Sequence, residues 1–134
     1  MLVDHCQPAL KQTIAIVADE SDGAVIVHCT LGKDRTGVII ALLLSAVGVP
    51  DAVVVEDYTL TGEYVEPLLP TLREQALKTG RDMDVYEKML VTDAAAMARF
   101  LQYVHDEYGG ASEYLRRIGI TDAQLTALRA RLVL

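Results

Sequence analysis

The pattern of hydrophobic and polar positions predicts a mostly helical domain with one short strand. Apolar residues recur at helical spacing at Leu10, Ile14 and Val17, and a longer apolar run at 38–49 predicts a buried helix over about 35–47. Ala24 to Val27 is a β-branched run behind a turn signal, and it is the best strand candidate. Because the backbone groups of a buried strand must be paired, this lone strand predicts an incomplete sheet.

Start and stop signals divide the second half of the chain into further helices. Residues 50–60 fit either a strand around Val53 to Val55 or a helix that begins after Pro50. Residues 63–78 are helix-like, but their two prolines, Pro67 and Pro70, predict a break between them.

The last third of the chain contains three more helical segments. Thr92 resembles the N-cap of a long helix that ends at Gly109, and Ser112 starts a short helix that Gly119 closes. Thr121 to Gln124 matches a capping box that opens the final helix. The predicted inward face of the long helix consists of Met97, Phe100, Leu101, Val104 and Tyr108.

Composition limits the classes of partner. The 134 residues fit one domain, and the formal net charge of −7 argues against nucleic acid and against attraction to anionic membranes. The N-terminus has no basic and apolar leader pattern, and the longest apolar run is too short to span a bilayer. Two cysteines are too few for a disulfide framework, so we expect a cytoplasmic protein without stable membrane insertion.

The stretch HCTLGKDRTG, residues 28–37, predicts a phosphate-binding loop between the strand and the apolar helix. Gly32 permits a tight turn, and the N–H groups of successive residues can converge on an oxyanion in front of the helix N-terminus. Arg35 can add a planar bidentate charge. The expected phosphate-binding residues are Thr30, Leu31, Gly32, Lys33, Asp34 and Arg35.

The positive electrostatic potential of these N–H groups, of the helix N-terminus and of Arg35 also acts on the Cys29 thiol. A lowered pKa would make the thiolate available near neutral pH for attack on a bound phosphoryl group. Thr36 is placed to hydrogen-bond the sulfur, which makes it a better leaving group, and His28 is expected to orient the loop rather than act as a base. This chemistry requires no metal and no cofactor.

The loop resembles the sequence signature of a known family. It contains the H-C-x5-R-[ST] signature of the cysteine-based protein tyrosine phosphatases, and its Gly-Lys-Asp-Arg-Thr-Gly form resembles the bacterial branch similar to mycobacterial tyrosine phosphatase B. The segments 57–61 and 108–115 are similar to later elements of that branch.

The resemblance implies an α/β fold in which a strand-loop-helix cradle is followed by a helical lid over about 63–90 and by C-terminal helices. It implies hydrolysis of phosphotyrosine in proteins through a phospho-cysteine, with phosphoserine, phosphothreonine and phosphoinositides as further substrate classes. In the family, a lysine at the position of Lys33 is associated with phosphoinositides. An aspartate at the position of Asp34 has been considered as the proton donor to the leaving group.

The chain also departs from the family, whose members are longer at the N-terminus. The missing part supplies most of the central sheet and usually the loop with the general acid, so residues 1–134 form an N-terminally short phosphatase-like domain. A second copy of the chain could complete the sheet. Two alternatives therefore stay open, namely a non-catalytic phosphate-binding module and a fragment that needs its N-terminal half.

Two upstream residues have weaker claims to a role. Asp4 is the best of the upstream carboxylates as an alternative acid. Cys6 is expected to be an inert thiol, with a disulfide to Cys29 as the alternative.

Overall fold

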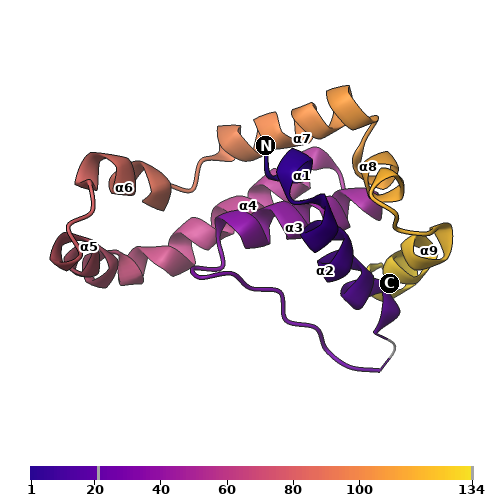
Figure 1. The fold of residues 1–134 in the computed structure, drawn as a ribbon, viewed down its shortest axis with the longest axis horizontal. Coiled ribbons are helices and arrows are strands. Elements are labelled where there is room, and N and C mark those ends of the chain that lie inside the picture. Colours follow the sequence, from indigo (N-terminus) through magenta and orange to yellow (C-terminus); the bar gives the residue numbers. More distant parts are fainter. Residues whose placement is uncertain (21, 134) are drawn as a thin grey trace.

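The computed structural model describes residues 1–20 and 22–133, which form a helical assembly (Figure 1). Residues 22–33 form an extended segment, which runs along one side of the molecule in Figure 1 before the central helix begins at Asp34. The helices of the described residues are α1 (Leu2–His5), α2 (Gln7–Asp19), α3 (Asp34–Ala46), α4 (Asp51–Val65), η1 (Glu66–Leu68), α5 (Leu69–Lys78), α6 (Met83–Leu90), α7 (Ala94–Tyr108), α8 (Ala111–Arg117) and α9 (Asp122–Leu132).

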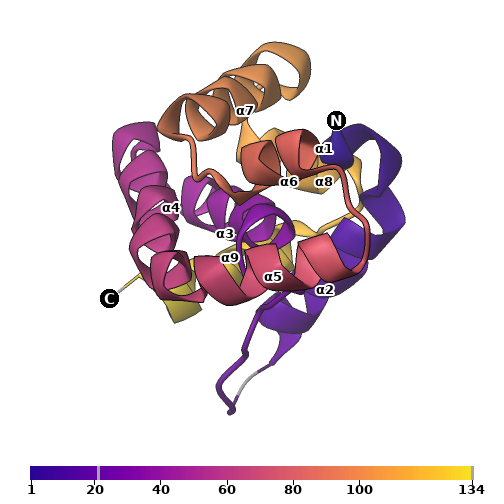
Figure 2. The ribbon, with the colours of Figure 1, turned by 90° about the vertical axis from the view of Figure 1, so that its left-hand side faces the viewer.

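The apolar helix α3 lies at the centre of the core. It packs against α4 and α8, with further contacts to α2 and α9, and α7 lies along α4 (Figures 1 and 2). Leu42 of α3 is fully buried, as are Ile14 of α2, Leu115 of α8 and Leu128 of α9. Burial of each such side chain stabilises the fold by about 1.5–3 kcal/mol. The core therefore fixes the helix that directly follows the Cys29 loop.

Helices α5 and α6 form an arm that projects from one end of this core (Figure 1). The predicted break is present, because Pro67 lies in the 3-10 turn η1 and Pro70 opens α5. Gly80 ends α5 with a φ of 68°, and the Asp82 carboxylate then caps α6 by accepting from the N–H groups of Asp84 and Val85. The arm is thus a pair of short helices with defined ends.

The predicted strand is wrong for the described residues, which contain no strand. Val25 and Val27 pack partly against the core while Ile26 between them is 85% exposed, so the segment alternates as a strand would. No second extended segment lies beside it to complete a ladder in the described part of the chain. The helix-dominated part of the predicted fold is confirmed, whereas the α/β class with an incomplete sheet is not.

Other boundaries follow the capping signals closely. A helix, α4, begins after Pro50, so the helical alternative for residues 50–60 is confirmed, and Asp93 caps α7 where Thr92 was predicted. Gly109 ends α7 in the left-handed conformation with a φ of 79°. The capping box of Thr121 and Gln124 is confirmed at the start of α9. Every helix in the described ranges is too short or too polar to cross a membrane.

Candidate active site

Cys29 lies half-buried at the end of the extended connection, just before α3. Burial alone would raise the pKa of its thiol. The hydroxyl of Thr36 and the N–H groups of Thr36, Leu31 and Lys33 outweigh burial by donating to the sulfur, and the pKa falls from 9.0 to about 6. Thr36 is the third residue of α3, where an N–H has no partner within the helix. Cys29 is therefore mainly a thiolate at neutral pH.

The hydroxyl of Thr36 is buried and has no hydrogen-bond partner of ordinary length among the described residues. It lies close enough to the Cys29 sulfur to help lower the pKa of the thiol. A hydrogen bond from Thr36 to the sulfur during catalysis stays a prediction.

The remaining loop residues shape the space in front of the sulfur. Gly32 has a φ of 68°, which a side chain would strain. Arg35 Nη2 donates to Thr30 Oγ1 at 2.9 Å, so the guanidinium is held across the loop. His28 Nδ1 lies 3.2 Å from the carbonyl oxygen of Cys29, and its expected role in orienting the loop stays a prediction.

The side chain of Lys33 bonds to other parts of the protein, and its expected role as a phosphate ligand stays a prediction. Its side chain is buried, with only 2% of the residue exposed. The ammonium donates to Asp34 Oδ1 at 2.5 Å and to the carbonyl oxygen of Val91 at 3.2 Å. Lys33 contributes its N–H to the Cys29 sulfur, but its charge joins the loop to the connection between α6 and α7.

Asp34 lies at the first position of α3, between two neighbours. Besides Lys33, the Tyr58 hydroxyl donates to its Oδ1 at 3.5 Å. Burial, followed by the charge of Asp34, raises the pKa of Tyr58. The side chain of Asp34 is still 64% exposed and Asp34 lines the space in front of Cys29. Asp34 therefore lines the cavity that contains Cys29, and its role as a proton donor stays a prediction.

A cavity of about 480 Å³ lies between the Cys29 loop and the arm. The loop supplies Cys29, Thr30, Leu31, Asp34 and Arg35. The arm supplies an apolar wall of Leu72, Ala76, Met89 and Leu90, and a polar group of Gln75, Thr79, Arg81 and Tyr86. These polar residues were not among those predicted from the sequence. Arg81 could have been found there, because it is a charged residue next to the turn residue Gly80 in the segment expected to cover the loop.

The upstream candidates lie elsewhere. The carboxylate of Asp4 accepts hydrogen bonds from the hydroxyls of Tyr103, at 3.0 Å, and Tyr108. Bonds from the N-terminal amine and from Tyr108 lower the pKa of Asp4 to about 2. Cys6 is exposed, and both cysteines are free thiols. Neither Asp4 nor Cys6 lines the Cys29 cavity.

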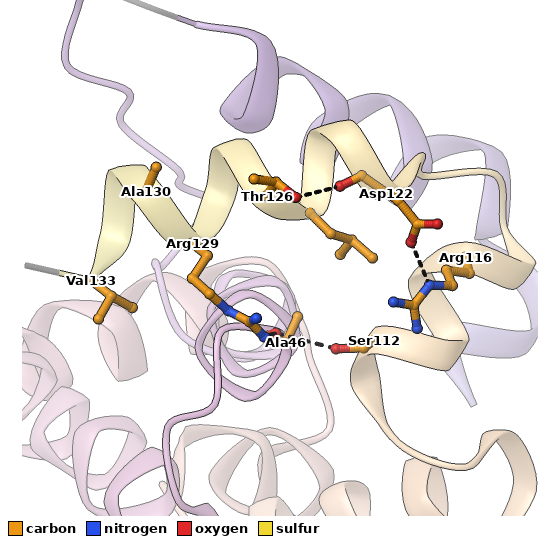
Figure 3. Close-up of a pocket in the computed structure, with 9 residues that line it drawn as sticks. Ala46, Ser112, Arg116, Asp122, Thr126, Arg129, Ala130 and Val133 are labelled. Atoms are coloured by element: carbon orange, nitrogen blue, oxygen red, sulfur yellow. Dashed lines mark hydrogen bonds and ion pairs between the residues drawn. The ribbon is translucent and has the colours of Figure 1, made fainter.

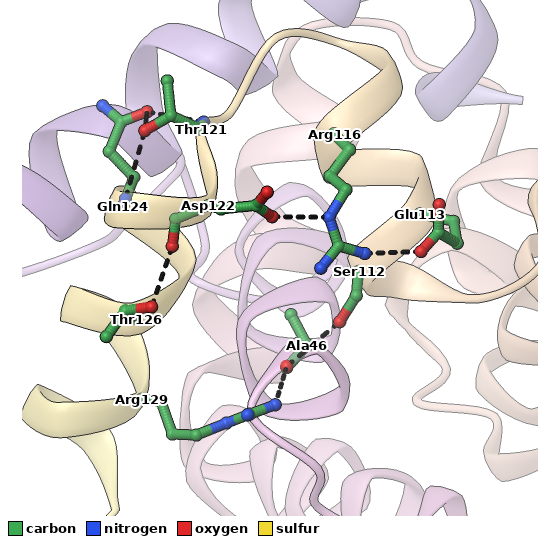
Figure 4. Close-up of polar contacts among 9 residues, drawn as sticks. All are labelled: Ala46, Ser112, Glu113, Arg116, Thr121, Asp122, Gln124, Thr126 and Arg129. Atoms are coloured by element: carbon green, nitrogen blue, oxygen red, sulfur yellow. Dashed lines mark hydrogen bonds and ion pairs between the residues drawn. The ribbon is translucent and has the colours of Figure 1, made fainter.

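A second cavity, of about 470 Å³, lies near the opposite end of α3, between α8 and α9 (Figure 3). Its polar groups mainly satisfy one another (Figure 4). The hydroxyl of Ser112 and the guanidinium of Arg129 donate to the Ala46 carbonyl oxygen, at 3.2 and 3.5 Å. The Arg116 guanidinium bonds Asp122 at 2.7 Å. A cation at a helix C-terminus stabilises that helix, so this network supports α3 from the end remote from Cys29.

Comparisons with known proteins agree with this geometry. The sequence model of the tyrosine phosphatase family matches residues 1–134. A tyrosine-protein phosphatase of Nostoc commune is 35% identical over 133 residues, which cover 96% of this chain and 45% of the relative. The triple specificity protein phosphatase PtpB of Mycobacterium tuberculosis is 30% identical over 138 residues, covering 95% and 49%. The chain spans about half the length of the curated relatives it matches.

Proposed function

The chain belongs to the tyrosine phosphatase family, and on that premise we propose that it hydrolyses phosphate monoesters at Cys29, with phosphotyrosine in proteins as the first substrate class. The observation that carries the proposal is that Cys29 and the Arg35 guanidinium line one cavity, and the lowered pKa of the Cys29 thiol, about 6, supports it. The apolar wall of the arm offers a surface for an aromatic ring. Phosphoserine, phosphothreonine and phosphoinositides follow as further classes.

The proposed reaction has two steps. The Cys29 sulfur attacks the phosphorus, a sulfur–phosphorus bond forms, and the ester bond from phosphorus to the leaving oxygen breaks. The N–H groups of residues 30–35 and the guanidinium of Arg35 stabilise the equatorial oxygens of the transition state. The leaving oxygen takes up a proton. Water then attacks the phospho-cysteine, which releases inorganic phosphate and returns the thiolate with help from the Thr36 hydroxyl.

Asp34 is the proposed proton donor to the leaving oxygen, since it lines the cavity and is exposed. A general acid matters most when the leaving group is poor, and general acids typically raise the reaction rate by roughly 10²- to 10⁴-fold. We expect Asp34→Asn to slow an alkyl phosphate far more than an activated aryl phosphate. Equal losses on both substrates would remove Asp34 from this role.

The test of the proposal is turnover of an activated aryl phosphate by the purified chain, beside Cys29→Ser and Arg35→Ala. We expect the wild type to release phosphate and both variants to lose nearly all activity. Substantial turnover by Cys29→Ser would show that the nucleophile is wrong. If the wild type is inactive yet binds vanadate or phosphate in an Arg35-dependent way, the chain is a phosphate-binding module.

The assembly and location of the active form belong to the same proposal. Residues 1–134 act as one phosphatase-like domain, and the extended segment 24–27, with Ile26 exposed, offers a backbone edge to a second copy or to a further segment of the protein. Sedimentation of the purified chain tests the second copy directly, and a monomer at every concentration would exclude it. Because a catalytic thiol needs reducing surroundings, the proposed place of action is the cytoplasm.

A further inference from the structure

Arg81 is a second guanidinium in the Cys29 cavity, opposite Arg35. It makes no ion pair in the described part of the chain, whereas Arg73 of the same arm is bonded to Glu87 at 2.6 and 2.9 Å. A neutral hydroxyl holds Arg35, so neither guanidinium forms an ion pair within residues 1–20 and 22–133, and Asp34, the carboxylate that lines this cavity, is paired with Lys33.

The backbone of Arg81 is fixed by the two helix ends that flank it. Gly80 adopts a φ of 68°, and the Arg81 N–H donates to the Ala76 carbonyl oxygen at 3.0 Å, which closes α5. The next residue, Asp82, caps α6. The side chain therefore starts from a defined point.

The guanidinium is also oriented. Its central carbon lies 5.4 Å from the centroid of the Tyr86 ring, which is a cation–π distance. An arginine that stacks on an aromatic face keeps its in-plane N–H donors available, and those donors match the two oxygens of a carboxylate. Arg81 is thus a preorganised donor beside the space where a phosphoryl group would meet Cys29.

We propose that Arg81 determines substrate specificity by binding an acidic side chain next to the phosphotyrosine of a peptide. This inference rests on the proposed function of the Cys29 site. A peptide is favoured over an anionic lipid because the formal net charge of −7 acts against the whole of an extended anionic membrane surface, whereas a single acidic side chain needs only the local charge of Arg81. The apolar wall beside Arg81 also fits a phosphotyrosine ring. A phosphotyrosine ring on Leu72, Met89 and Leu90 would leave its neighbouring residue near Arg81.

The experiment measures kcat/KM for three phosphotyrosine peptides that differ only in whether the flanking residues are glutamate, alanine or lysine. We expect wild type to prefer the glutamate peptide over the alanine peptide by about tenfold, the effect of one good charge-assisted contact. Arg81→Met is expected to bring this ratio close to one, and Arg81→Glu to favour the lysine peptide.

Lys78→Met is the matched control. Lys78 lies three residues from Arg81 in the same arm, but its ammonium is paired with Glu74 at 2.6 Å and it does not line the cavity. This variant removes the same charge and should keep the glutamate preference. An equal loss in Lys78→Met would mean that the general field of the arm sets the preference, and the proposal would be overturned.

Binding in a Cys29→Ser background separates this inference from the proposed function. If wild type turns over neither aryl phosphate nor peptide, hydrolysis fails, while an Arg81-dependent preference in peptide Kd still supports the specificity role. Active wild type without a glutamate preference overturns the inference alone. The inference would also be overturned if Arg81→Met weakened binding only to vesicles that contain a phosphoinositide and left peptide binding unchanged, because the ligand of Arg81 would then be a lipid headgroup.

Discussion

Thr36→Val should raise the pKa of Cys29, because it removes the hydroxyl that helps to lower the pKa of the thiol while keeping a β-branched side chain in α3. A hydrogen bond to a charged group is worth about 1.5–3 kcal/mol, and one pKa unit corresponds to about 1.4 kcal/mol. Since the backbone N–H donors remain and sulfur is a weak acceptor, we expect a rise of about one unit, from about 6 to about 7.

The assay is the rate of alkylation of Cys29 by iodoacetamide as a function of pH, read by mass spectrometry so that exposed Cys6 does not contribute. Only the thiolate reacts. At pH 6 the thiolate fraction should fall from about one half to about one tenth, so the rate should drop about fivefold, and the two proteins should converge near pH 9.

Thr36→Ser is the control, since it keeps the hydroxyl and should keep the wild-type pKa. The reasoning is refuted if Thr36→Val titrates with wild type, or if Thr36→Ser shifts as far as Thr36→Val. Either result would assign the lowered pKa to the backbone N–H groups alone.

Three further predictions concern stability, each measured by urea unfolding. Gly37→Ala should destabilise the fold by about 1–3 kcal/mol, because its Cβ would lie 2.8 Å from the ring of buried Tyr58. Gly62→Ala should stabilise it by about 0.5–1 kcal/mol, because its Cβ would lie 3.5 Å from the nearest atoms, those of Thr92. Equal effects of the two substitutions would contradict the close contact between Gly37 and Tyr58. Lys33→Met should cost about 1–2 kcal/mol because it removes the hydrogen bond from the buried Lys33 ammonium to the Val91 carbonyl oxygen, against less than about 1 kcal/mol for the exposed pair lost in Lys78→Met. A cost no larger than that of Lys78→Met would argue against this contact. The pKa of Cys29 in the folded protein, about 6, lies below its ordinary 9.0, so ionisation of the thiol stabilises the fold fully above pH 9, and this contribution is lost as pH falls through 6. The free energy of unfolding of wild type, relative to that of Cys29→Ser, should therefore decrease as pH is lowered from 9 to 6. A difference that does not change with pH would contradict the low pKa.

Much of the helical architecture could be predicted from local signals. The capping box at Thr121 and the glycine stop at Gly109 act within one turn of the chain, so the sequence alone contains the interaction that forms each boundary. The strand prediction at 24–27 failed for a different reason. Its residues favour an extended backbone, but a strand exists only when another segment pairs with it, and the described residues provide none.

In the candidate site, too, contacts between residues close in the sequence could be predicted, and contacts between distant segments could not. Cys29, Thr36 and Arg35 lie within one loop and the first turn of α3, so their spacing along the sequence is enough to predict that they lie close together, while their catalytic roles stay predictions. The position of the Lys33 ammonium depends on the Val91 carbonyl, 58 residues away, which no local pattern specifies. Arg81 belongs to a turn whose local signal is only a helix end, and it becomes part of the site when the arm packs over the loop.

The most direct test of the account is whether Cys29 becomes phosphorylated during turnover. The purified chain would be mixed with an activated aryl phosphate, quenched in acid within the first turnover, and digested for mass spectrometry. The account predicts a phosphoryl group on the Cys29 peptide of the wild type and none on Cys6 or in Arg35→Ala. Phosphate release without any modified Cys29 at any quench time would contradict the proposed nucleophile.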